Sequence, residues 1–119
     1  WDEAKLDHWY EHIWHPEIDW RAMEGAPDDV GPMHGRDQLR RYYDEWLELF
    51  EDITIEATGL REVGASVVAT FSVSARSRSA GMVTELAFAA VIKIGDGRIV
   101  GGREYATLEE AVAAAESGL

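Results

Sequence analysis

The sequence predicts one α+β domain in which helices cover a curved antiparallel sheet. Apolar residues recur at helical spacing in two segments of the first fifty residues, whereas residues 53–105 alternate like strands between turn signals. An alanine-rich segment then predicts a terminal helix. Because 119 residues suffice for one hydrophobic core, a single domain is expected.

The first segment predicts an amphipathic helix from Asp2 to His15, capped by Asp2 and ended by Pro16. Its apolar residues are Leu6, Trp9, Tyr10, Ile13 and Trp14. Residues 18–23 then alternate like a short strand. The three glycines and two prolines from Gly25 to Gly35 predict a loop.

The second helix is expected over residues 36–50, where Leu39, Tyr43, Trp46 and Phe50 form an apolar stripe. Turn signals at 62–65, 79–81 and 95–97 then predict three or four antiparallel strands. Thr107 and Glu110 form a capping box that begins a terminal helix ending near Gly118.

Side-chain alternation indicates which strand faces are interior. In the strand over 67–76 the interior set is Val67, Ala69, Phe71, Val73 and Ala75. In the next strand it is Leu86, Phe88, Ala90 and Ile92, whereas Glu85, Ala87, Ala89, Val91 and Lys93 form a solvated face or a dimer contact. In the last strand, alternation alone permits either Val100, Gly102 and Glu104 or Ile99, Gly101, Arg103 and Tyr105.

The charge balance and composition exclude several classes of function. With 23 acidic and 11 basic residues, the net charge is −12, so nucleic acid and anionic membranes are not expected as partners. The chain has no Cys, and no segment is apolar over the length of a membrane span. The start lacks the features of a signal peptide, so the cytoplasm is the expected location.

The order of the elements, with His15-Pro16-Glu17, Gly35-Arg36-Asp37 and Arg103-Glu104-Tyr105 at their junctions, resembles the nuclear transport factor 2-like superfamily. Its SnoaL-like polyketide cyclase branch is most similar. The resemblance implies a cone-shaped sheet around an apolar cavity, frequently in a dimer, and no cofactor. Since relatives carry one more helix ahead of Trp1, residues 1–119 are expected to form one SnoaL-like domain without that helix.

Glu104 is the first candidate for a catalytic residue. Arg103-Glu104-Tyr105 resembles the Arg-Asp-Tyr of limonene epoxide hydrolases, whose acid points into the cavity, and this resemblance selects Val100, Gly102 and Glu104 as the inward set. A carboxyl among apolar groups has a raised pKa, which suits acid–base chemistry. The alternative is a Glu paired with an Arg or lying at the rim. The other hydrolase residues are replaced by Phe71 and Val73, which argues against epoxide hydrolysis.

Asp28-Asp29-Val30-Gly31 resembles the Asp-Pro-Val-Gly of ketosteroid isomerases, and Tyr43 lies where those enzymes keep a supporting Tyr. Their oxyanion-stabilising Asp is replaced by Ala90, which removes a preorganised donor. Asp28 and Asp29 are therefore either functional or ordinary loop residues.

Histidines supply two further candidates. His34 lies beside the expected cavity mouth and is either a proton carrier or an exposed loop residue. His8, His12 and His15 have ligand-like spacing but cluster opposite the apolar stripe of their helix, so they are expected in solvent and no metal is expected.

Two hypotheses of function remain open. The first is cofactor-free acid–base chemistry of the isomerase, cyclase or lyase kind on a small hydrophobic, carbonyl-bearing molecule, with Glu104 transferring the proton and His34, Asp29 or Asp28 assisting. The substrate-binding residues are then expected to be Trp20, Tyr43, Trp46, Phe50, Phe71, Phe88, Ala90 and Gly102. The second is a non-catalytic ligand-binding or dimerisation module of the same fold, with the homodimer formed through the outer face of the sheet.

Overall fold

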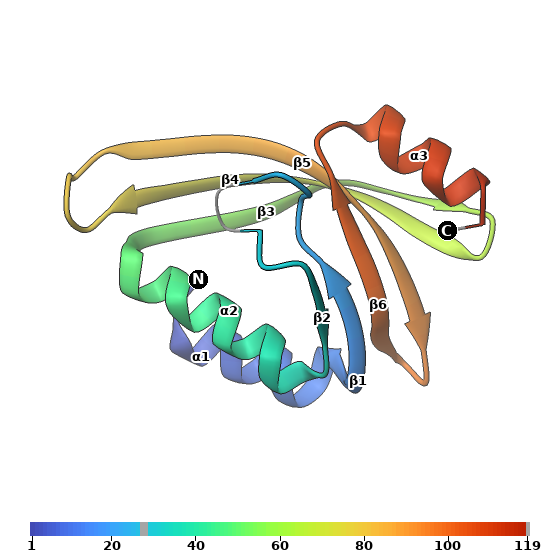
Figure 1. Ribbon diagram of the computed structural model, residues 1–119, viewed down its shortest axis with the longest axis horizontal. Coiled ribbons are helices and arrows are strands. Elements are labelled where there is room, and N and C mark those ends of the chain that lie inside the picture. Colours follow the sequence, from blue (N-terminus) through green and yellow to red (C-terminus); the bar gives the residue numbers. More distant parts are fainter. Residues whose placement is uncertain (27–28, 119) are drawn as a thin grey trace.

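The computed structural model describes residues 1–26 and 29–118. Its elements are α1 (Glu3–His8), the π-helical turn η1 (Trp9–Ile13), β1 (Trp14–Arg21), β2 (Pro32–His34), α2 (Arg36–Leu49), β3 (Phe50–Val63), β4 (Ser66–Ser77), β5 (Val83–Gly95), β6 (Arg98–Tyr105) and α3 (Leu108–Glu116). In this part of the chain the strands form one curved, six-stranded sheet in the order β2-β1-β6-β5-β4-β3. Figure 1 shows α1 and α2 against one face of the sheet and α3 against the other.

The α+β prediction is confirmed, with one correction to the sheet. Strands β3 to β6 form an antiparallel meander with turns at the three predicted places. Strand β1, however, pairs with β6 in parallel, so the sheet is mixed. Tight turns impose antiparallel pairing only on neighbours in the chain, whereas β1 and β6 are far apart in sequence. The predicted loop also contains β2, which pairs with β1.

The first helix is shorter than the sequence predicts. Asp2 caps it as expected, accepting a hydrogen bond from the Lys5 amide at 3.0 Å. The α-helix ends at His8, one π-helical turn follows, and Trp14 already belongs to β1. Trp14 is 3% exposed and lies opposite Ile99 of β6. Its apolar character therefore reflects burial in a strand, although its spacing from Tyr10 continues the helical pattern.

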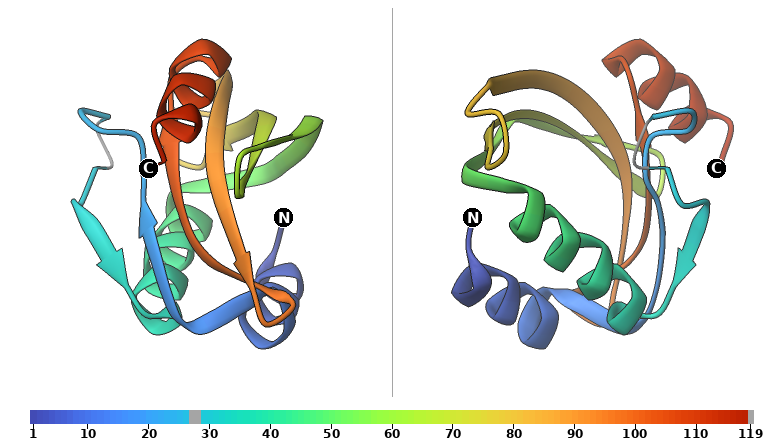
Figure 2. Two further views of the ribbon diagram at one scale, coloured as in Figure 1. Left: turned by 90° about the vertical axis from the view of Figure 1, so that its right-hand side faces the viewer. Right: turned by 60° about the vertical axis from the view of Figure 1, so that its left-hand side comes forward.

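Irregular pairing at the outer edge contributes to the curvature of the sheet. The register between β3 and β4 shifts between Glu51 and Thr54 and again between Ala57 and Gly59. Asp52, at the first shift, has a positive φ of 53°, which Asp adopts more readily than most residues. Such bulges bend a strand and increase its twist. Figure 2 shows the resulting arch above α1 and α2, which lie side by side.

The concave face carries the predicted interior set. Ala69, Ala90 and Ile92 form a buried cluster there, and the half-buried Phe71 and Ile99 pack against it. A second cluster joins α1, β1 and α2, and its buried members are Leu6, Trp14, Ile18, Ala22, Met33, Leu39 and Tyr42. The concave core thus combines residues of α1 and α2 with residues of β1, β2, β4, β5 and β6.

The convex face is not simply a solvated surface. Ala89 and Val91, predicted to face solvent or a dimer partner, are buried with Val68 beneath Ala111 and Ala115 of α3. The predicted cap of α3 is present, because Thr107 Oγ1 accepts the Glu110 amide hydrogen at 3.2 Å. A homodimer through this face stays a prediction. The contact would be limited to the part of the convex face that α3 does not cover, and the mass of the protein in solution tests it.

The last strand follows neither predicted alternation throughout. Gly102 lies opposite Ile92 and Glu104 opposite Ala90, so both belong to the concave face as expected. The register shifts between Lys93 and Ile94, which places Ile99 in the concave cluster. The expectation for Val100 is therefore wrong, because a bulge reverses the alternation that would have turned it inward.

None of the described helices has both the length and the apolar character needed to cross a membrane.

Candidate functional site

A hollow of about 370 Å³ lies between α2 and the concave face of the sheet. Its described lining consists of Met23, Ala26, Tyr42, Tyr43, Trp46, Ile55, Val73, Leu86, Ala87, Phe88, Glu104 and Ala106. Helix α2 supplies the three aromatic residues with hydroxyl or indole groups, the strands supply the opposite wall, and the loop after β1 supplies Met23 and Ala26. The volume is in the range of small-molecule sites.

A smaller inner chamber of about 90 Å³ lies against the hollow. It shares Tyr43, Ile55 and Phe88 with the hollow. Its other described lining residues are Trp1, Trp9, Trp14, Trp20, Leu39, Phe71, Ile92 and Ile99. The concave side therefore contains open space, although the inner chamber is lined by four tryptophans and by Phe71 in addition to the shared Phe88.

Stacked rings fix the walls of these spaces. Trp14 stacks on Tyr43 with ring centroids 5.8 Å apart, and Phe71 stacks on Phe88 at 5.2 Å. Tyr43 and Trp46 continue the row along α2 with ring centroids 6.3 Å apart. The half-buried Phe50 of β3 packs on Trp46 at 5.8 Å, but this predicted substrate-binding residue is not among the described lining residues of either space. Because large rings are rigid and packed on one another, the walls are largely preformed.

Glu104 lies in the hollow as the sequence predicted. Its side chain is half-buried at the end of β6, and its Oε2 accepts a hydrogen bond from the indole Nε1 of Trp20 at 2.8 Å. The carboxylate is the one charged group among the described lining residues. The structure thus places a potential proton carrier against an aromatic, otherwise uncharged space.

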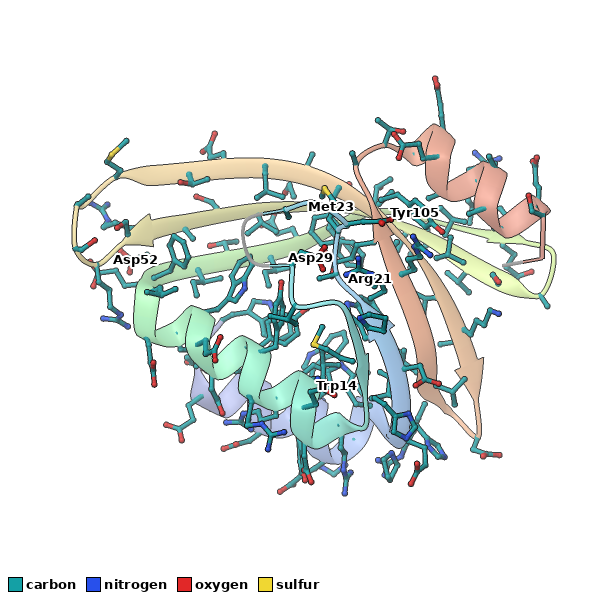
Figure 3. The ribbon with its side chains drawn as sticks, viewed as in Figure 1. Trp14, Arg21, Met23, Asp29, Asp52 and Tyr105 are labelled. Atoms are coloured by element: carbon teal, nitrogen blue, oxygen red, sulfur yellow. The ribbon has the colours of Figure 1, made fainter. Side chains whose placement is uncertain are left out.

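Asp29 has a structural role in the loop between β1 and β2. Arg21 of β1 pairs with the Asp29 carboxylate through the two terminal nitrogens of its guanidinium group. The amides of Gly25 and Gly31 also donate to this carboxylate, at 3.0 Å and 2.9 Å. The hydrogen bonds from Arg21, and then those from the two amides, hold the pKa of Asp29 well below its ordinary value. Figure 3 shows Asp29 directed toward Arg21. A carboxylate held in this way is suited to anchor the loop and poorly suited to carry protons.

His34 lies away from the hollow, contrary to its expected place at the cavity mouth. It is exposed on β2, with Nδ1 2.6 Å from Asp19 Oδ1 and Nε2 3.2 Å from Glu17 Oε2. The hydrogen bond to Asp19 is the main reason why the pKa of His34 is raised. The imidazole lies at the edge of the sheet and is not among the described residues that line the hollow.

Of the remaining predicted substrate-binding residues, some line the inner chamber and others lie beneath its lining. Trp20 and Phe71 line the inner chamber, whereas Ala90 is fully buried beneath it in the concave cluster. Gly102 lies directly under the Trp20 ring. Asp28 lies outside the described residues.

Tyr42 and Met23 are lining residues that the sequence analysis missed. Tyr42 is 8% exposed and follows Leu39 by three residues, so a helical spacing of three as well as four would have identified it. The alternation of residues 18–23 predicts that Met23 ends a strand. Its role depends on how the loop after β1 folds back, which no local pattern indicates.

A second concavity, the outer groove, lies on the convex side beside α3. It has a volume of about 720 Å³ and its floor includes Gly101 of β6, which contributes no side chain. Arg21 and Arg103 at its border pair with Asp29 and Glu24, and Lys93, Asp19 and His34 also line it. Although larger than the hollow, the outer groove is bordered by several charged side chains and lacks the row of packed aromatic rings that surrounds Glu104 in the hollow.

The histidines of the first helix form no metal site. His8 and His12 are exposed, and His15 is half-buried, with its Nδ1 accepting a hydrogen bond from the Glu17 amide at 3.0 Å. Within residues 1–26 and 29–118, no group of three or more His, Cys, Asp and Glu side chains is arranged to hold a metal ion.

The curved mixed sheet, its helices and the hollow on its concave side define a cone-shaped protein of the α+β class. Residues 1–102 match the model of the SnoaL-like domain, and the chain belongs to this family. No curated protein matches the chain significantly.

Solved structures agree with this family. An NTF2-like protein from Burkholderia thailandensis has a TM-score of 0.73 and 24% identity, with 92% of this chain and 83% of that chain covered. A candidate SnoaL-like polyketide cyclase from Jannaschia sp. has a TM-score of 0.70 and 14% identity, covering 98% and 81%. A hypothetical protein of ketosteroid isomerase-like fold from Catenulispora acidiphila, in complex with trimethylamine, has a TM-score of 0.67 and 17% identity, covering 90% and 78%. At these identities the similarity establishes the fold alone.

Proposed function

We propose that the protein is a cofactor-free acid–base enzyme of the isomerase or cyclase kind, acting on a small hydrophobic molecule with a carbonyl group. The observation that carries the proposal is the carboxylate of Glu104 in the wall of an aromatic hollow. A side chain that moves a proton in catalysis must lie within hydrogen-bonding reach of the bound substrate. Among the described lining residues, Glu104 is the charged group that meets this condition.

The chemistry of the site follows from its lining. Glu104 would remove a proton from the carbon next to the carbonyl and return it at another carbon. In a cyclisation the carbanion would instead attack a second carbonyl carbon of the substrate, and the oxygen of that carbonyl would take the proton back from Glu104. Either route produces an enolate, which needs hydrogen-bond donors at its oxygen. Tyr42 and Tyr43 carry the hydroxyl groups in the described lining and would supply them. An uncharged substrate suits a space with aromatic walls and a single carboxylate.

Proton abstraction can be tested without the natural substrate. A nitro-substituted benzisoxazole reports on a carboxylate base in an apolar site, since removal of its ring C–H proton breaks the N–O bond and releases a coloured cyanophenolate. The wild-type protein should accelerate this reaction, and Glu104→Gln should abolish the acceleration. Naphthol binding, followed by its fluorescence, should be nearly the same in both proteins because the amide preserves the shape of the side chain.

Glu85→Gln is the matched control, since Glu85 is exposed on β5 and points away from the concave face. It should behave like the wild type in both measurements. If Glu104→Gln and the wild type released the cyanophenolate at the same rate, Glu104 would not be the proton carrier.

A non-catalytic ligand-binding module is the second candidate. It is supported by the positions of His34 and Asp29, since neither joins Glu104 in the hollow. Binding of naphthol with no acceleration of the benzisoxazole reaction by the wild-type protein would favour this alternative. The trimethylamine complex of the Catenulispora protein makes small amines suitable further probes of the hollow.

A further inference from the structure

Trp20 and Gly102 form one unit with Glu104 across the parallel pair of strands. In the register of β1 and β6, Trp20 lies opposite Gly102. The indole extends along β6 from that point and donates its Nε1 hydrogen to Glu104, a residue 84 positions away in the sequence, at 2.8 Å. Two residues along a strand span roughly 6.6 Å, a distance that an indole side chain can bridge.

The absence of a side chain at Gly102 permits this arrangement. A Cβ atom at this position would lie 2.2 Å from Cζ3, 2.6 Å from Cε3 and 2.9 Å from Cη2 of Trp20. These distances are far below van der Waals contact, and the close contacts are with a rigid ring packed against the inner chamber. The indole can therefore lie flat across β6 only while residue 102 is glycine.

The type of donor matters for a proton carrier. Asp29 is held by a guanidinium, whose permanent charge keeps the carboxylate ionised. Glu104 is instead held by an indole N–H, which is uncharged and can only donate. An indole fixes the orientation of the carboxylate and cannot itself take the substrate proton. Glu104 is thus oriented by a group that leaves its acid–base chemistry available.

We infer that Trp20 is a positioning residue that orients the Glu104 carboxylate toward the hollow, and that Gly102 is required because its missing side chain makes room for the indole. The inference rests on the proposed function for its catalytic consequence. Its structural part, the coupling of residues 20, 102 and 104, can be measured without any reaction.

The structural part is tested by NMR of the tryptophan side chains in the full chain. Five tryptophans give five indole N–H signals, and the signal absent from Trp20→Phe belongs to Trp20. Glu104→Gln and Gly102→Ala should each shift this signal. Gly101→Ala is the matched control, because a Cβ there would meet only the Asp19 carbonyl oxygen, at 3.4 Å, and it should leave the signal in place. An unmoved signal in both Glu104→Gln and Gly102→Ala would overturn the inference.

The catalytic part is tested with the nitro-substituted benzisoxazole. Trp20→Phe and Gly102→Ala should each lower kcat on the order of a hundredfold with a much smaller change in KM, as expected when a reacting group is misplaced by about an ångström. Combining the two substitutions should add little, since both remove the same orientation. Gly101→Ala should retain wild-type kcat. If Trp20→Phe, folded as judged by its Tm, kept the wild-type kcat, Trp20 would have no positioning role.

Failure of the proposed function can be told apart from failure of this inference. A wild-type protein as inactive as Glu104→Gln refutes the catalytic proposal, while shifts of the Trp20 signal in Glu104→Gln and Gly102→Ala still support the coupling. An active wild-type protein with an unaltered Trp20→Phe variant refutes the inference and leaves Glu104 in place.

Discussion

The two helical layers of the molecule bury the same sheet in different ways. On the convex side, α3 packs its alanines on Val68, Ala89 and Val91, and small side chains meet with little space between them. On the concave side, tryptophan and tyrosine rings of η1, β1 and α2 line a hollow and an inner chamber together with Phe71 and Phe88 of the sheet. Large rigid rings interdigitate less closely than alanines, so they leave enclosed space between the helices and the sheet. The concave layer therefore encloses two aromatic-walled spaces, whereas the outer groove on the convex side lies beside α3.

The largest effect should come from truncating the support of the concave layer. Leu39 on α2 is 1% exposed and lines the inner chamber. Leu39→Ala should lower the free energy of unfolding by about 2–5 kcal/mol, since it removes buried methyl groups beside an existing void. Urea unfolding measures this loss. Leu60→Ala, at a position 70% exposed on β3, should stay within about 0.5 kcal/mol of the wild type, and equal losses in the two variants would contradict the proposed contrast.

Enlarging a residue in the convex layer tests whether that layer is as tightly packed as the comparison states. Ala111→Leu places three more carbon atoms at a site that is 0% exposed and should lower the free energy of unfolding by about 1–3 kcal/mol. Ala113→Leu, on the exposed side of the same helix, is the control for the change in helix propensity. If Ala111→Leu were as stable as Ala113→Leu, the convex layer would contain unfilled space.

The smallest effect should arise at the edge of the sheet, outside both layers. Since the folded-state pKa of His34 is raised above 6.5, mainly by the hydrogen bond to Asp19, the protonated ring stabilises the folded state. This contribution is complete below the unfolded pKa and is lost as the pH rises through the folded one. The Tm difference between the wild type and His34→Gln should therefore be greatest below pH 6.5 and shrink above it. Asp19→Asn should weaken the trend, and a difference that grew with pH would contradict the assignment.

The spacing of apolar residues predicted the strands and helices well where one spacing, helical or alternating, continued through a whole segment. The alternation of β4 and β5 holds in the structure, and Leu39, Tyr43 and Trp46 of the predicted stripe lie on α2, whereas Phe50 already begins β3. The patterns failed where the backbone conformation or the strand register changed within a segment whose apolar spacing did not change. Trp14 continues the helical spacing of Tyr10 although the chain has entered a strand, and Val100 follows a bulge that reverses the faces of β6.

The candidate site was predictable only in part, because its members meet through tertiary structure. Glu104 was found by its resemblance to a strand-end motif, and the aromatic wall by helical spacing. The bond from Trp20 to Glu104 depends on the parallel register of β1 and β6, which no short-range signal encodes. The sequence could not decide between the alternatives for His34 and Asp29 for the same reason, since their partners Asp19 and Arg21 follow from the pairing of β1 with β2 and the fold of the loop between them.

The parallel pairing of β1 with β6 also has a consequence for the order of assembly. Strands β3 to β6 are connected by tight hairpins, whose closure costs little chain entropy. Strand β1, in contrast, pairs with β6, which lies near the other end of the sequence, so this pairing closes a long loop. We therefore expect the meander to fold first and the N-terminal fifty residues to dock onto it. On this route the hollow between α2 and the concave face is completed only in the last step, so any ligand of the hollow could bind a nascent chain only after β6 has formed.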